Sequence, residues 1–108
     1  MFLLLFFINF SSYALVFKCE NYKKLFEAKI RVNDDYKRAK VDYTFEGYQR
    51  NFSDRIGLGY VKSNKKIDRI YIKRGKLKMN LKIYSKSHIT GEFCPKENRK
   101  INFKCIQK

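Results

Sequence analysis

The amino-acid sequence predicts a single small α+β domain, in which one helix packs on an antiparallel β-sheet. Two patterns predict this fold: apolar residues recur at helical spacing around residue 40, and they alternate with polar residues from Thr44 onward. The chain has 108 residues, of which 44% are hydrophobic and 17% aromatic. This composition is too rich in core-forming side chains for a disordered protein, and this length excludes a large multidomain enzyme.

Residues 1–14, MFLLLFFINFSSYA, have the pattern of a secretory signal peptide. An apolar run over residues 2–10 precedes Ser12-Tyr13-Ala14, which places small residues at the two positions that a signal peptidase reads. We therefore expect cleavage after Ala14, a mature domain of residues 15–108 and a secreted protein. The run is short for a membrane span, which needs about 20 apolar residues. An uncleaved anchor and a buried N-terminal strand remain alternatives.

Two strands and one helix are expected in the first half of the domain. Residues 16–19 form a short strand, and residues 25–32 (LFEAKIRV) suit a strand better than the start of a helix. The helix is expected over residues 34–43, because Asn33 is a suitable N-cap residue and acidic side chains follow it in the first turn. Its buried stripe has spacings of four, three and four residues: Val32, Tyr36, Ala39 and Tyr43.

The clearest element is a hairpin of residues 67–73 and 77–84 around the turn Arg74-Gly75-Lys76. Alternation directs one set of apolar side chains into the core: Ile70, Ile72, Leu77, Met79, Leu81 and Ile83. A last strand is expected over residues 101–106. Glycines and polar pairs are expected to separate the short strands, at Gly47, Gly57, Gly59, Ser63-Asn64 and Gly75.

The other face of this hairpin is strongly basic. Residues 62–86 contain ten Lys or Arg and one acidic residue, for a net charge of +9 within a chain of +15. Six side chains share the exposed face: Arg69, Tyr71, Lys73, Lys78, Lys82 and Tyr84. Cations neutralise phosphates and aromatic rings stack on bases, so the face suits single-stranded nucleic acid, RNA especially. A solubilising surface, or one that meets anionic lipid or an acidic protein, remains an alternative.

The chain offers few groups for catalysis. Glu46 as base, Arg69 as phosphate clamp and His88 form the set that RNA cleavage would use, although their spacing does not force them together. A Gly-rich phosphate loop, a nucleophile elbow and an HExxH motif are all missing from the sequence. One His and no CxxC pair predict no metal site, and no cofactor is expected. Asn51 begins a glycosylation sequon, Asn51-Phe52-Ser53.

Secretion permits disulfides, and the chain has three cysteines, Cys19, Cys94 and Cys105. A Cys19–Cys105 bridge would join the two ends of the domain and close a loop of about 85 residues, which stabilises by about 4 to 5 kcal/mol in the chain-entropy model. We favour this pairing, which leaves Cys94 free or paired with another molecule. A competing Cys94–Cys105 bridge would close a much smaller loop.

The leader, the motif Phe17-Lys18-Cys19 just after it and Cys105 near the end together resemble the small secreted effector candidates of powdery mildew fungi. Mature proteins of that group begin with a Tyr/Phe/Trp-x-Cys motif and end near a second Cys. Many of them are RNase-like and have the fold of the small fungal guanyl-specific ribonucleases. The resemblance covers the mature chain and implies an RNase-like fold, with one helix on an antiparallel sheet and the terminal cysteines bridged.

The same resemblance implies that activity is lost. Asp68-Arg69 before Ile-Tyr-Ile is similar to the ribonuclease strand whose Arg contacts the substrate phosphate, so Arg69 would be the surviving catalytic residue. Tyr84 or Ser85 stands near the place of the family's catalytic His, and residues 58–61 contain no Glu for the catalytic carboxylate. These departures imply a pseudo-ribonuclease.

The function that the resemblance implies is that of a virulence factor. A secreted effector would be delivered towards a host plant cell, with translocation into the cell as an open step, and would bind host RNA or a host protein to weaken plant immunity. A plant intracellular immune receptor would recognise some members. The alternatives are a weakly active secreted ribonuclease and a cationic antimicrobial protein that acts on membranes. No stable membrane association is expected, because the cations lie on strands whose apolar face is needed for the core.

Overall fold

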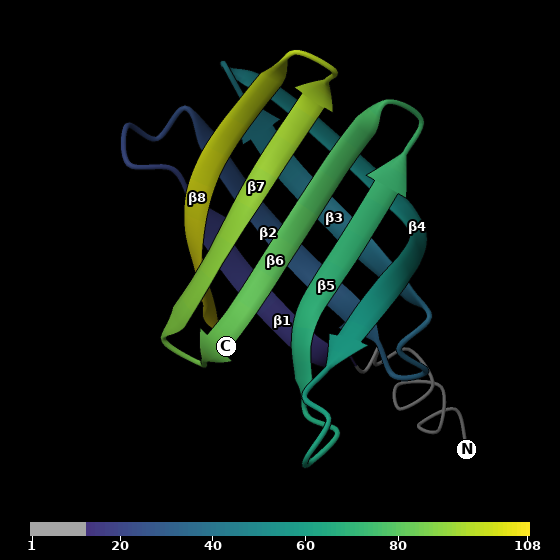
Figure 1. The fold of residues 1–108 in the computed structure, drawn as a ribbon. Coiled ribbons are helices and arrows are strands. Elements are labelled where there is room, and N and C mark those ends of the chain that lie inside the picture. Colours follow the sequence, from purple (N-terminus) through teal and green to yellow (C-terminus); the bar gives the residue numbers. More distant parts are fainter. Residues whose placement is uncertain (1–12) are drawn as a thin grey trace, which may run out of the picture.

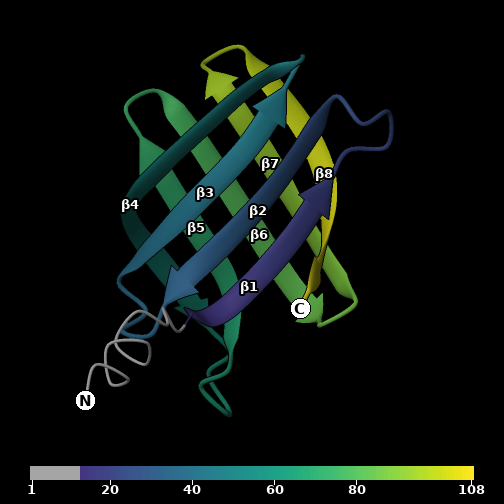
Figure 2. The same cartoon turned by 180° about the vertical axis from the view of Figure 1, so that it is seen from behind.

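The computed structural model describes residues 13–108 as eight antiparallel strands that close into one barrel (Figure 1, and Figure 2 from behind). The strands follow one another around the barrel in chain order, so that β1 meets β8 at the seam. Their bounds are β1 Tyr13–Glu20, β2 Phe26–Asn33, β3 Arg38–Phe45, β4 Tyr48–Tyr60, β5 Ile67–Arg74, β6 Leu77–Ser85, β7 His88–Lys96 and β8 Arg99–Gln107. Most of the expected signal peptide lies outside the described residues, and its last two residues, Tyr13 and Ala14, belong to β1.

The predicted α+β fold is wrong, because the described residues form strands and turns and contain no helix. Residues 34–43, expected to be helical, form the turn after β2 and most of β3. The stripe assigned to a helix joins two alternating patterns: Val32 ends the inward set of β2, while Ala39 and Tyr43 belong to that of β3. Tyr36 lies in the turn between them with a φ of 58°, a left-handed conformation that no helix contains.

The expected RNase-like scaffold is wrong for a related reason. An open sheet needs a helix to cover its apolar face, whereas a closed sheet buries that face against itself. Alternate residues of all eight strands point into this barrel, and large side chains fill it. The most buried of them are Phe17, Phe26, Phe93, Ile30, Ile70, Ile72, Met79, Leu81, Ile89, Val32 and Val41.

The predicted hairpin is confirmed as β5 and β6. Their register places Ile70 opposite Leu81 and Ile72 opposite Met79, and all four side chains are buried. Gly75 begins the two-residue turn with a φ of 60°, as the first central residue of a type II′ turn requires. The other strands expected from the sequence, at residues 16–19, 25–32 and 101–106, correspond to parts of β1, β2 and β8.

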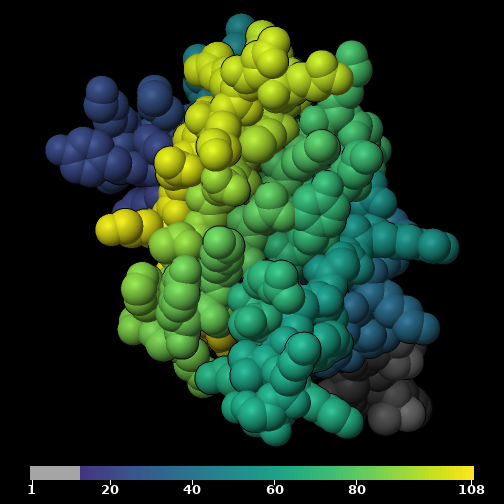
Figure 3. Space-filling view, viewed as in Figure 1, coloured from purple at the N-terminus to yellow at the C-terminus, as the bar shows by residue number. Residues whose placement is uncertain are grey.

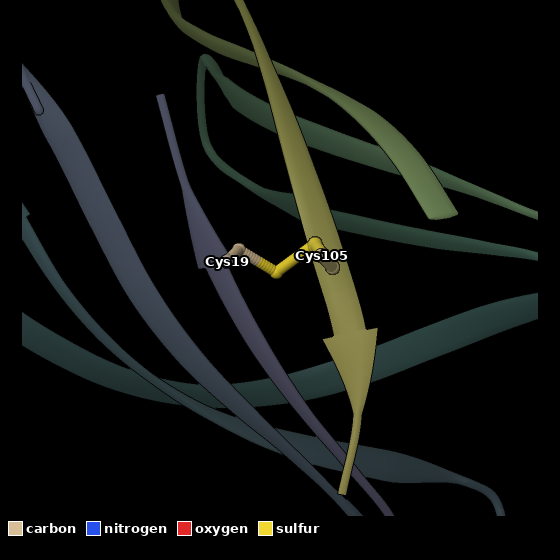
Figure 4. Close-up of a disulfide and its surroundings, with 2 residues drawn as sticks. All are labelled: Cys19 and Cys105. Carbon is tan, nitrogen blue, oxygen red and sulfur yellow. A yellow bond between two sulfur atoms is a disulfide. The ribbon is translucent and has the colours of Figure 1, made fainter. Parts of the chain in front are cut away.

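The barrel closes at a short seam, where residues 17–20 of β1 pair with residues 104–107 of β8. Cys19 lies opposite Cys105 in this register, and the two form a disulfide across the seam (Figure 4). The sequence favoured this pairing over Cys94–Cys105, and Cys94 is a free thiol on β7. Phe17 points inward beside Cys19, and both are buried, so the aromatic-x-Cys motif serves the core.

Aromatic rings fill the interior near the end of the barrel that carries the β3–β4 turn. The ring of Phe93 stacks on that of Phe26 at a centroid distance of 4.6 Å and meets that of Phe45 at 5.4 Å. The Arg99 guanidinium lies 4.9 Å from the centroid of Phe45 and donates a hydrogen bond of 2.8 Å to Glu46. Stacked rings therefore fill this end of the barrel interior.

Candidate functional site

The outer face of the β5–β6 hairpin brings the six predicted binding residues together (Figure 3 views this side of the barrel). Arg69 lies directly opposite Lys82, and Lys73 lies directly opposite Lys78. Tyr71 stands between these two cation pairs, and 39% of its surface is exposed. The six residues thus form one continuous surface, which we call the hairpin face: Arg69, Tyr71, Lys73, Lys78, Lys82 and Tyr84.

The hairpin face contains no acidic side chain, and the two hairpin strands carry a single acid, Asp68. Like charges also meet at the opposite wall, where Lys18 faces Lys29, but Asp42 faces Lys29 from the next strand and pairs with Arg31. On the hairpin side, the carboxylate of Asp68 lies 3.5 Å from Arg69, whose side chain remains 63% exposed. Like charges placed directly opposite each other destabilise a sheet, so the cation pairs leave a positive potential that a bound anion would relieve.

Two glycines of β4 extend this surface, a position that the sequence did not predict. Gly57 and Gly59 were expected to separate strands, but they lie inside β4 and face Tyr71 and Arg69. The guanidinium of Arg69 lies so close over Gly59 that a Cβ there would be 2.5 Å from its Nε. The alternation of Ile56 and Leu58 toward the core is the signal that could have placed both glycines on the outside. The result is a shallow depression floored by backbone and bordered by Arg69 and Tyr71.

Tyr84 forms the end of the hairpin face nearest the β6–β7 turn. Its ring stacks on the imidazole of His88 at a centroid distance of 4.7 Å, and it remains 61% exposed. A stacked, exposed pair of flat rings beside Lys82 resembles the surfaces on which unpaired bases stack. His88 therefore lies against the candidate site.

The three candidate catalytic residues do not meet. In an up-and-down barrel successive turns alternate between the two ends, so the β3–β4 turn with Glu46 and the β6–β7 turn next to His88 lie at opposite ends (Figure 1). Glu46 is engaged by Arg99, whereas Arg69 lies on the outer face of β5. The described geometry therefore assembles no acid–base pair around a phosphate bound to Arg69.

Other features of the described residues concern glycosylation, metal ligands and membrane-spanning helices. Asn51 is exposed on the outer face of β4, so its sequon is accessible. Among residues 13–108 no group of three or more His, Cys, Asp or Glu could hold a metal ion. Nor does the described part of the chain contain a helix long and apolar enough to span a membrane.

Two of the described side chains, Lys100 and Tyr43, have shifted pKa values. The ammonium of Lys100 lies 3.0 Å from the Glu92 carboxylate, and this hydrogen bond raises the pKa of Lys100. The Lys100 ammonium thus lies beside the Glu92 carboxylate next to the hairpin face and offsets part of the repulsion that this carboxylate would exert on an anion. Burial raises the pKa of the Tyr43 hydroxyl inside the barrel, and the charge of Arg50 opposes that shift.

Comparisons with protein-family models, with curated proteins and with solved structures find no match to this chain.

Proposed function

We propose that this chain is a secreted, non-enzymatic protein that binds single-stranded RNA through the hairpin face. The observation that carries the proposal is the placement of Tyr71 between two cross-strand cation pairs, Arg69–Lys82 and Lys73–Lys78, on a hairpin that contains almost no acids. Lys and Arg neutralise phosphates, while an exposed ring among them can stack on an unpaired base. A purely solubilising surface would need neither an aromatic ring between the cation pairs nor a hairpin with so few acidic residues.

The cellular setting is proposed from the resemblance to the powdery mildew effector candidates. The RNase-like part of that resemblance no longer applies, but the leader, the Phe17-Lys18-Cys19 motif and the terminal Cys105 support it still. On this proposal the chain is an effector that acts in or near a host plant cell, binds host RNA and weakens plant immunity. Glu46 and His88 lie at opposite ends of the barrel, and this separation supports a role without RNA cleavage.

The test is a titration of labelled single-stranded RNA with the oxidised protein, purified from a secretory host, at low and at moderate salt. We expect salt-sensitive binding, because each phosphate contact releases counterions. The triple variant Arg69→Glu, Lys78→Glu, Lys82→Glu should lose this binding.

The matched control is the variant Lys18→Glu, Lys29→Glu, Lys40→Glu. It makes the same change in net charge, at exposed positions on the outer faces of β1–β3. Equal losses in the two triple variants would contradict a specific surface and leave only net charge. The same samples, run on a denaturing gel, should contain intact RNA, and cleavage would contradict the non-enzymatic proposal.

A further inference from the structure

We infer that the bound RNA strand runs across the β-strands, in a groove that leads from the hairpin face over β7 and β8 to the β1–β2 loop. This inference rests on the proposed function and extends it to the path and the strandedness of the ligand. It assigns a role to residues outside the hairpin, chiefly Lys104 and Tyr22.

The groove is continuous because two depressions of the outer surface share their lining. One lies over Gly57 and Gly59 of β4, and the other reaches Lys104 of β8 and Tyr22 of the β1–β2 loop. Three residue positions line both depressions: Asn80, Lys82 and Glu92. The hollow therefore extends across β5, β6, β7 and β8, all of which face the viewer in Figure 1.

A row of four outward side chains, three of them cationic, follows one side of this groove. Arg69, Lys82, Thr90 and Lys104 lie directly opposite one another on successive strands, and their side chains point outward. At about 4.8 Å per strand, the row from Arg69 to Lys104 is about 14 Å long, enough for a few phosphates of an extended strand. The backbone of the RNA would follow this row.

A second row suits nucleobases. It lies two residues from the first row on each strand, on the side of the β5–β6 turn. Its members are again directly opposite one another: Tyr71, Asn80, Glu92 and Asn102. A phenol ring can stack on a base, while amides and a carboxylate can bond the hydrogen-bonding edges of bases. Bases in a duplex are already stacked and paired, so only a single strand can use both rows.

The β1–β2 loop forms the far wall of the groove. The amide of Asn21 donates a hydrogen bond of 2.7 Å to the backbone carbonyl of Asn102, which holds the loop beside β8. Tyr22 follows with 95% of its surface exposed, on the loop that projects beside β8 in Figure 3. This ring offers a second stacking position at the end of the groove opposite Tyr71.

The test compares a labelled single-stranded RNA with the same sequence in a duplex, for wild type and three variants over a series of salt concentrations. Single-stranded RNA should bind more tightly than the duplex. Tyr71→Ala should weaken single-strand binding about 5- to 150-fold, the range for loss of one base–aromatic stack, without changing the salt dependence.

Lys104→Gln should flatten the slope of log K against log salt by about 0.7. Lys40→Gln, at an exposed position of β3, is the control and should leave the slope nearly unchanged.

The outcomes separate this inference from the proposed function. If Lys104→Gln behaves as Lys40→Gln does, or if the duplex binds as tightly as the single strand, the path across the strands is wrong. Binding that still disappears on charge reversal of the hairpin would then leave the proposed function standing. Wild-type protein that binds neither RNA would contradict both.

Discussion

Gly91 of β7 points into the barrel and lies beneath the ring of Phe103. A Cβ at Gly91 would overlap two ring carbons of Phe103, closer than real Cβ contacts allow. We expect Gly91→Ala to lower the free energy of unfolding by about 1 to 3 kcal/mol, the cost of overpacking a filled core. Denaturant unfolding followed by tyrosine fluorescence measures the change.

Gly57→Ala is the matched control for that substitution. Gly57 also lies within a strand, but a Cβ there would meet only Tyr71, at an ordinary 3.8 Å. Its effect on stability should be small or slightly favourable, because alanine reduces the entropy of the unfolded chain. Equal destabilisation by the two substitutions would mean that the Phe103 contact does not decide the cost at Gly91.

At the level of secondary structure, the β2–β3 turn offers the sharpest test of the corrected fold. Tyr36 adopts a φ of 58°, which costs a non-glycine residue roughly 1 to 2 kcal/mol. Tyr36→Gly should therefore raise the free energy of unfolding by about 1 kcal/mol, because glycine adopts this conformation freely. Glycine in the helix that the sequence predicted would instead lower stability by about 1 kcal/mol, so the two folds predict opposite signs.

The control for Tyr36→Gly is Lys37→Gly, in the same turn. Lys37 is exposed and is not among the residues with positive φ, so glycine there relieves no strain. Thermal or urea unfolding of both variants supplies the comparison. A stabilised Lys37→Gly alongside an unchanged Tyr36→Gly would contradict the turn geometry.

The contrast between the two hairpins explains which elements could be predicted. Residues 69–73 and 77–84 alternate on both sides of a glycine turn, so the inward faces of these strands followed from period two alone. Around residue 36 the end of one alternating run and the start of the next happen to fall at helical spacing, beside residues that favour an N-cap and a turn equally. The local pattern could not distinguish a helix from two strands joined by a turn. The pairing of β3 with β2 and with β4 decides for the strands.

The candidate site could be predicted only where its residues lie on a single hairpin. Six exposed residues of one hairpin were placed correctly because they lie on strands that pair with each other. Lys104 and Tyr22 could not be joined to them from the sequence, since their proximity depends on closure of the barrel between β8 and β1. The chemistry of Glu46 and His88 suits RNA cleavage, but the sequence contains nothing that brings them together, and the alternation of turns separates them.

At the scale of the whole molecule, closure depends on the shortest ladder in the barrel. β1 and β8 pair over residues 17–20 and 104–107, whereas β3 and β4 pair along the whole of β3. The Cys19–Cys105 disulfide crosses this seam at a sequence separation of 86 residues. A crosslink of this span stabilises by about 4 to 5 kcal/mol in the chain-entropy model, a large share of the 5 to 15 kcal/mol typical of a domain.

Removal of the disulfide should therefore open the barrel at its seam before it disturbs the hairpin face. We expect Cys19→Ala, Cys105→Ala to lower the free energy of unfolding by about 4 kcal/mol, and amide exchange to rise in β1 and β8 well before it rises in β5 and β6. Cys94→Ser is the control, because this free thiol takes no part in the closure, and it should leave both measurements nearly unchanged. If exchange rose equally in all eight strands, closure of the seam and integrity of the hairpin would be a single cooperative event. Because Lys104 lies at the seam and Lys82 does not, an open seam should disturb the far end of the RNA groove and leave the cation pairs of the hairpin in place.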